Sequence, residues 1–164
     1  MYNMRQRKSV RLKGYDYSQN GCYFITICTK NRQCLFVDIV DETMQLNEYG
    51  EIAESEILKI PSHYTNVKPS SFVVMPNHVH LIIAVFDDNC RQTGAASGAP
   101  TEETRITIGN VIRGYKSGVS RKIGYSPWQR NYHDNIIRND ESYQTIATYI
   151  DNNPKLWSED RFYR

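Results

Sequence analysis

The chain has 164 residues, of which 40% are hydrophobic and 23% charged, and its formal net charge is +2. This balance is typical of an ordinary globular protein and argues against a disordered chain. No apolar run approaches the roughly 20 residues that cross a membrane, and the segment MYNMRQRKSVRLKG lacks the apolar centre of a secretory signal. We therefore expect one domain over residues 1–164, in the cytoplasm and without a membrane segment.

Charged residues are segregated along the chain. Two basic clusters contain no acidic residue, one in a basic N-terminal arm at 1–14 (Arg5, Arg7, Lys8, Arg11, Lys13) and one further on (Arg105, Arg113, Lys116, Arg121, Lys122). Acidic residues gather instead between Asp38 and Glu56. Such clusters attract a nucleic-acid backbone, although a solvated face of one sign is the commoner explanation. The four cysteines lack CxxC spacing, which indicates reduced thiols.

The first part of the chain predicts one strand and one helix. CYFITICT at 22–29 alternates and is rich in β-branched and aromatic residues, which is typical of a strand. NEYGEIAESEILKI at 47–60 has the apolar spacing of an amphipathic helix, which Pro61 is expected to end.

The central part predicts a hairpin followed by a loop. The later part of TNVKPSSFVVM and then HVHLIIAVF at 78–86 are both strand-like, and the Pro76-Asn77 turn signal joins them. Residues 87–105 have the Gly, Ala, Ser and Pro content of a flexible loop.

The last part predicts a helix, a strand and a second helix. Residues 106–122 indicate a glycine-weakened helix, and the segment from Trp128 through NYHDNIIR indicates a fourth strand. ESYQTIATYIDNN at 141–153 is helical, with caps available at Asn139 or Asp140. The order predicts an α+β fold: a ferredoxin-like, split β-α-β antiparallel sheet with helices packed on one face and an added C-terminal helix.

Two histidines and two helical residues form the candidate site. Side chains alternate along a strand, so His78 and His80 point to one face and Val79 to the other. On the last helix Tyr149 and Asn153 are four residues apart and lie on one line. That line flanks the apolar stripe, which consists of Tyr143, Ile146, Ala147 and Ile150.

This arrangement has the layout of a catalytic metal site. His78 and His80 would supply two nitrogen ligands and Asn153 one oxygen ligand, which leaves positions open for water and a phosphate. An amide oxygen and phosphate chemistry favour Mg²⁺ or Mn²⁺, and the Tyr149 phenolate could then attack phosphorus. Taken singly, each signal has a simpler explanation: structural histidines, a packing tyrosine and an Asn at a helix end.

Together, the ordered motifs CYFITICTKNR, VVMPNHVHLIIAV, GYKSGVSRKIG, WQRNYHDNIIRND and YIDNNP resemble the single-tyrosine HUH transposases, and within them the REP-associated tyrosine transposases. The resemblance runs from about Lys13 to about Trp157. It implies that His78 and His80 are the metal pair, Tyr149 the nucleophile and Asn153 the helix-borne third ligand.

The resemblance also implies a function. Such proteins cut single-stranded DNA near hairpins, keep a 5′-phosphotyrosine and rejoin the strand, with a divalent metal and no nucleotide cofactor. A bacterial, nucleoid-associated protein is expected. Arg5, Arg7, Lys8 and Arg11 would grip a hairpin stem or flanking strand, and Arg113, Lys116, Arg121 and Lys122 would line the DNA path.

Several alternatives stay open at the level of the sequence. A ferredoxin-like sheet can bind single-stranded nucleic acid without catalysis, and the histidine pair could serve a zinc hydrolase that uses water. The hydrolase is disfavoured because no acidic general base is evident nearby. The resemblance leaves open the target DNA, and whether the site is completed within one chain or across a homodimer.

Overall fold

The computed structural model describes residues 16–17, 19–40, 43–86 and 106–163. The predicted basic arm at 1–14, with Arg5, Arg7, Lys8 and Arg11, lies outside the described residues. So does the predicted loop at 87–105.

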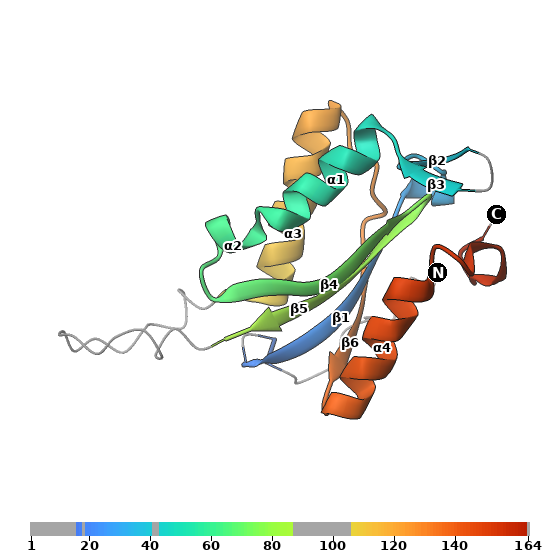
Figure 1. Cartoon of the computed structure of the whole chain (residues 1–164). Helices are drawn as coiled ribbons and strands as arrows, with labels where there is room; N and C mark the ends of the chain where they lie inside the picture. Colours follow the sequence, from blue (N-terminus) through green and yellow to red (C-terminus); the bar gives the residue numbers. More distant parts are fainter. Residues whose placement is uncertain (1–15, 18, 41–42, 87–105, 164) are drawn as a thin grey trace, which may run out of the picture.

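A four-stranded antiparallel sheet forms the centre of the molecule (Figure 1). Its strands are β1 (Gly21–Cys28), β4 (Val67–Met75), β5 (His78–Val85) and β6 (His133–Ile137). They lie in the order β4-β5-β1-β6, and each neighbouring pair is antiparallel. Helix α1 (Glu48–Leu58) connects toward β4, and helix α3 (Ile108–Ile123) lies between β5 and β6 in the chain. This is the predicted split β-α-β arrangement.

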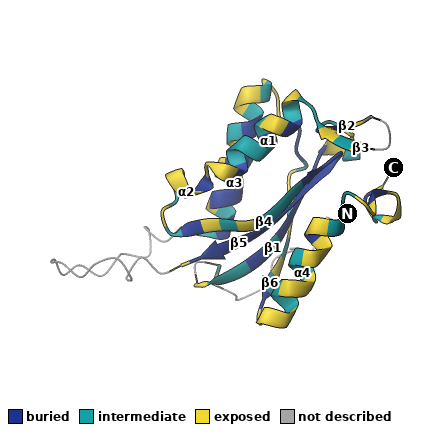
Figure 2. Ribbon diagram, in the orientation of Figure 1, coloured by how far each residue is buried: buried dark blue, intermediate teal, exposed yellow. Residues whose placement is uncertain are grey.

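Helices cover both faces of the sheet (Figure 1). On one face, Val79, Leu81 and Ile83 of β5 join a core cluster with residues of α1 and α3. On the other face, Ile82 packs with Ile150 of helix α4 (Asp140–Asn152). The two connecting helices therefore share one face, as predicted, while the added C-terminal helix covers the opposite face. Figure 2 shows the strands buried between these layers and the outer side of α4 exposed.

Two elements of the first half differ from the sequence-based expectation. A two-stranded antiparallel sheet, β2 (Val37–Val40) with β3 (Thr43–Leu46), was not predicted. Each strand has four residues, which is too few for an alternation of apolar and polar residues to stand out in an acid-rich segment. Helix α1 ends at Leu58, before Pro61 as predicted, but Pro61 itself lies in the first turn of a short helix that was not predicted, α2 (Ile60–His63). Proline is accommodated in a first turn, where its missing N–H would have no partner.

The elements around the histidines match their prediction closely. Pro76 and Asn77 form the two-residue connection between β4 and β5, with Met75 opposite His78 in the register. Asn139 caps α4, its side chain accepting a hydrogen bond from the Ser142 N–H at 2.8 Å. After α4 the chain turns through the short helix η4 (Trp157–Glu159). Trp157 and Phe162 then pack on Cys28 and Met75, which returns the C-terminal segment to the sheet.

None of the described helices combines the length and apolar character that a membrane crossing requires.

Candidate metal and nucleophile site

His78 and His80 lie side by side on the face of β5 that α4 covers. Both side chains are fully buried, and their ring centroids are 4.4 Å apart. His78 Nδ1 is 2.9 Å from Asn77 Oδ1, and His80 Nδ1 is 2.8 Å from Thr26 Oγ1. With both Nδ1 atoms occupied by protein partners, the Nε2 atom of each ring faces the cluster: that of His78 has no hydrogen-bond partner among the described residues, and that of His80 faces the Tyr149 hydroxyl.

The last turn of α4 brings Tyr149 and Asn153 to the histidines. Tyr149 Oη lies 3.3 Å from His80 Nε2, and the two ring centroids are 5.3 Å apart. Asn153 is buried at the C-cap of the helix, whereas Tyr149 is 39% exposed. The structure thus places a phenol reachable from solvent beside a buried pair of imidazoles and a buried amide.

Asp160 completes the cluster, and the expectation that no acidic residue lies nearby is wrong. Its Oδ2 accepts hydrogen bonds from Tyr149 Oη at 3.0 Å and from Asn153 Nδ2 at 2.9 Å. Asp160 offers one ligand atom, as do His78 and His80, and these three atoms lie within 4.8 Å of one another. The segment WSEDRFYR has no periodicity that reveals this position, because it depends on how the chain returns after α4.

Two buried atoms of the cluster have unused lone pairs. Among the described residues, His78 Nε2 and Asn153 Oδ1 have no hydrogen-bond partner. The bond from Asn153 Nδ2 to Asp160 fixes which end of the amide is the free oxygen. An unsatisfied buried polar atom destabilises a protein by about 1–3 kcal/mol. Nitrogen and oxygen atoms with free lone pairs are the ligands that divalent cations take, so the residues present fit a metal with nitrogen and oxygen ligands.

Burial keeps both histidines neutral. Desolvation lowers the pKa of His78 to about 4. The pKa of His80 is lowered to about 3, mainly by desolvation and in addition by the neighbouring His78. Burial also raises the pKa of Tyr149, as does its hydrogen bond to Asp160. Burial alone would raise the pKa of Asp160, yet the bonds from Phe162, Asn153 and Tyr149 hold it below its usual value. At neutral pH the cluster therefore offers two neutral imidazoles and one carboxylate.

These shifts predict acid sensitivity of the metal-free protein. Histidine in an unfolded chain has a pKa of about 6.5, so below that pH the unfolded state binds more protons than the folded state. We expect the free energy of unfolding to fall as the pH is lowered from about 6.5 toward about 4. For each histidine the fall is about 1.4 kcal/mol per unit by which its pKa in the folded state lies below its pKa in the unfolded state. Urea titrations across this range measure it. A double variant, His78→Gln with His80→Gln, should lose most of the slope, and an unchanged slope would contradict the assignment.

A cavity of about 470 Å³ opens beside Tyr149. Its lining comes from three strands, α4 and the C-terminal segment: Phe24, Thr26, His80, His133, Asp134, Asn135, Tyr149 and Arg161. The cavity combines aromatic rings, polar side chains, the Asp134 carboxyl group and the Arg161 guanidinium beside the candidate nucleophile.

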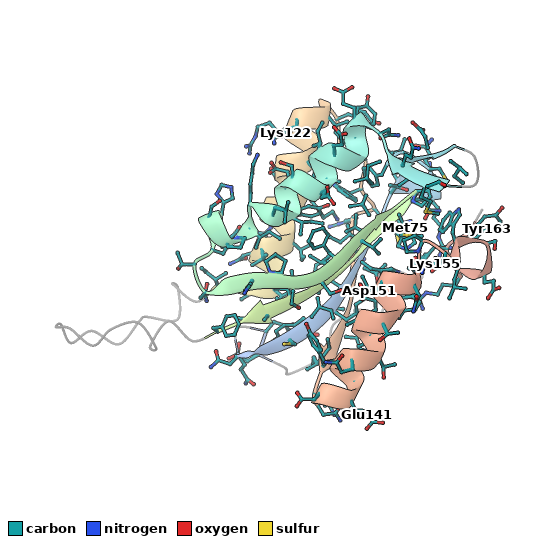
Figure 3. The ribbon with its side chains drawn as sticks, in the orientation of Figure 1. Met75, Lys122, Glu141, Asp151, Lys155 and Tyr163 are labelled. Carbon is teal, nitrogen blue, oxygen red and sulfur yellow. The ribbon has the colours of Figure 1, made fainter. Side chains whose placement is uncertain are left out.

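The predicted DNA-binding residues of α3 lie away from this cluster. Arg113, Lys116, Arg121 and Lys122 belong to the helix on the opposite face of the sheet, and Figure 3 shows Lys122 far from the end of α4. Lys122 Nζ pairs with Glu56 at 2.7 Å. Lys116 Nζ donates to the carbonyl oxygens of Gln129 and Arg130 at 2.5 and 3.2 Å. The structure therefore does not bring these four residues into the histidine site.

Three known proteins are similar to this chain. The solved structure of a REP-associated tyrosine transposase bound to a REP hairpin matches with a TM-score of 0.58 and 18% identity, over 92% of this chain and 76% of that chain. A Haemophilus influenzae protein named "Putative REP-associated tyrosine transposase" is 22% identical over 85% of this chain and 73% of its own length. An uncharacterised Haemophilus influenzae protein is 41% identical, over 98% of this chain and 94% of its own length. No family model matches the chain.

The fold is that of the REP-associated tyrosine transposases, and the resemblance seen in the motifs is confirmed at this level. The chain belongs to one family with the uncharacterised Haemophilus influenzae protein to which it is 41% identical.

Proposed function

We propose that the protein is a metal-dependent nuclease and strand transferase for single-stranded DNA that carries hairpins. The observation that supports this best is the position of Tyr149 Oη, 3.3 Å from His80 Nε2 and within a cluster that has two free ligand atoms. A purely structural histidine pair would have its polar atoms satisfied, because buried polar groups are normally hydrogen-bonded.

In this proposal Tyr149 is the nucleophile. Its Oη attacks the phosphorus of the scissile phosphodiester, and the P–O3′ bond breaks to leave a 3′-hydroxyl on the upstream fragment. The downstream fragment stays on the protein as a 5′-phosphotyrosine. The phenol proton passes along its 3.0 Å hydrogen bond to the Asp160 carboxylate, which releases it to solvent, and the departing O3′ takes up a proton from water. Attack of another 3′-hydroxyl on the phosphotyrosine rejoins the strand without a nucleotide cofactor.

His78, His80 and Asn153 would hold the metal. When bound, Mg²⁺ or Mn²⁺ would supply Lewis-acid polarisation of the phosphate. Asn153 is the preferred oxygen ligand because its Oδ1 is free, whereas both Asp160 oxygens accept hydrogen bonds from protein groups. Asp160 then orients the Asn153 amide and adds negative charge beside the cation.

The proposed DNA partner rests on the neighbour that binds a REP hairpin. The basic residues Arg5, Arg7, Lys8, Arg11, Arg113, Lys116, Arg121 and Lys122 are proposed to contact hairpin or flanking DNA outside the cluster. The Tyr149–His80 contact within one chain supports a site completed without a second copy. We propose action in the bacterial cytoplasm, on nucleoid DNA.

A transfer assay with end-labelled DNA tests the function. Single-stranded oligonucleotides with REP-like hairpins are incubated with the protein and Mn²⁺, and the products are separated under denaturing conditions. We expect a denaturation-resistant conjugate that carries the 3′-end label but never the 5′-end label, and that EDTA abolishes. Two free fragments without a conjugate would indicate hydrolysis by water. Retarded but uncut DNA at every metal concentration would indicate a binding protein.

A further inference from the structure

Asn77, in the β4–β5 turn, is fully buried and uses all its side-chain and carbonyl groups. Its backbone oxygen accepts from Thr29 N at 2.9 Å and from Thr29 Oγ1 at 3.0 Å. Its Nδ2 donates to Phe162 O at 2.8 Å and to Arg32 O at 3.3 Å. Its Oδ1 lies 2.9 Å from His78 Nδ1. This side chain therefore connects the C-terminal segment directly to a candidate metal ligand.

The two carbonyl partners leave the amide only one orientation. A carbonyl oxygen cannot donate, so the Asn77 atom that faces Phe162 O and Arg32 O must be the NH₂ group. The atom that faces His78 is then the amide oxygen, which can only accept. A neutral imidazole carries one ring proton, so the proton must be on Nδ1 and Nε2 must be bare. His78 Nε2 is also the ring nitrogen without a partner among the described residues.

We infer that Asn77 is a positioning residue that locks His78 in the Nδ1–H tautomer, with Nε2 held as a lone-pair donor. The significance of this tautomer for metal binding rests on the proposed function, but the tautomer itself is a property of the metal-free chain. His80 differs, because its Nδ1 partner is the Thr26 hydroxyl, which can donate or accept. The lock also makes the C-terminal segment part of the site, since Phe162 O holds the amide in place.

Long-range ¹H–¹⁵N NMR spectra of the metal-free protein test the lock, because protonated and bare imidazole nitrogens give distinct signals. We expect His78 to show a protonated Nδ1 and a bare Nε2 near neutral pH. A protonated Nε2, or a mixture of both tautomers, would overturn the inference. The Thr26→Val variant is the matched control: it removes the corresponding partner of His80 and should leave the His78 signals unchanged.

Variants of Asn77 test its effect on the ligand set, with Mn²⁺ binding followed by electron paramagnetic resonance. Asn77→Leu removes the acceptor for His78, and we expect Mn²⁺ affinity to fall by about 10–100-fold, as when a partner behind a ligating histidine is lost. Asn77→Asp keeps an acceptor at Nδ1 and should bind Mn²⁺ more tightly than Asn77→Leu does. Unchanged affinity in Asn77→Leu would contradict the positioning role.

The two experiments separate this inference from the proposed function. If either variant fails to fold, judged by circular dichroism, the tautomer of the unmodified protein still decides the inference. If His78 shows the expected tautomer but the protein binds no Mn²⁺, the inference stands and the proposed function fails. If Mn²⁺ binds and DNA is cleaved while Nε2 carries the proton in the metal-free protein, the function stands and the inference fails.

Discussion

Replacing Tyr149 by Phe is expected to abolish the covalent protein–DNA conjugate while leaving Mn²⁺ and DNA affinity unchanged. The ring would keep its edge-on contact with Phe24, at 6.3 Å between centroids, and its contact with His80. Only the attacking oxygen is lost, together with its hydrogen bond to Asp160. Removal of a catalytic nucleophile lowers rates by about four to six orders of magnitude. The transfer assay with 3′-labelled DNA measures this loss.

Tyr143→Phe is the matched control for that variant. Tyr143 lies on the same helix, in the partly buried stripe that packs on Ile82 and Ile137, and its loss of a hydroxyl should leave conjugate formation unchanged. A conjugate that persists in Tyr149→Phe would mean that another residue is the nucleophile. Free fragments from both Tyr149→Phe and the unmodified protein would instead favour attack by water.

Adding Mn²⁺ to the metal-free protein is expected to raise its melting temperature markedly. A ligand that binds only the folded state at about 100 times its Kd stabilises that state by about 2.7 kcal/mol. For a chain of this size each kcal/mol corresponds to about 2–4 °C, so we expect a rise of about 5–10 °C. Satisfying the free His78 Nε2 and Asn153 Oδ1 is the physical source of this stabilisation. Calorimetry or thermal fluorescence measures the shift, and EDTA should reverse it.

Single-residue variants identify the groups responsible for this shift. His80→Ala should remove most of the rise in melting temperature. His63→Ala should leave the rise intact, because His63 is an exposed residue of α2. Asn153→Ala should weaken Mn²⁺ binding more than Asp160→Asn does, because the Asp160 oxygens already accept bonds from Tyr149, Asn153 and Phe162. A full melting shift in His80→Ala would place the metal elsewhere and contradict the proposed ligand set.

Much of this architecture could be predicted from the local periodicity of the sequence. The alternation that places His78 and His80 on one face is a property of any strand, and the spacing of Tyr149 and Asn153 is a property of any helix. In the structure these residues lie near one another because α4 packs its apolar stripe on the sheet face that carries the histidines.

Contacts that depend on the path of the chain could not be predicted in this way. Asn77 and Phe162 are 85 residues apart, and no repeat or spacing relates them. Asp160 reaches the site only because Trp157 and Phe162 anchor the C-terminal segment on Cys28 and Met75. The short β2–β3 pair was missed for a different reason, since four residues contain too few alternations to stand out from an irregular segment.

Tyr149 lies in the last turn of α4 and Asn153 at the C-cap of the same helix, and this has a thermodynamic consequence. If Asn153 holds the metal, a movement of α4 that withdraws the nucleophile also withdraws an oxygen ligand. Docking of the helix end and occupancy of the ion site are then coupled equilibria, and each must strengthen the other by the same factor. Metal concentration would thereby set the fraction of molecules whose nucleophile is in place, before any DNA has bound.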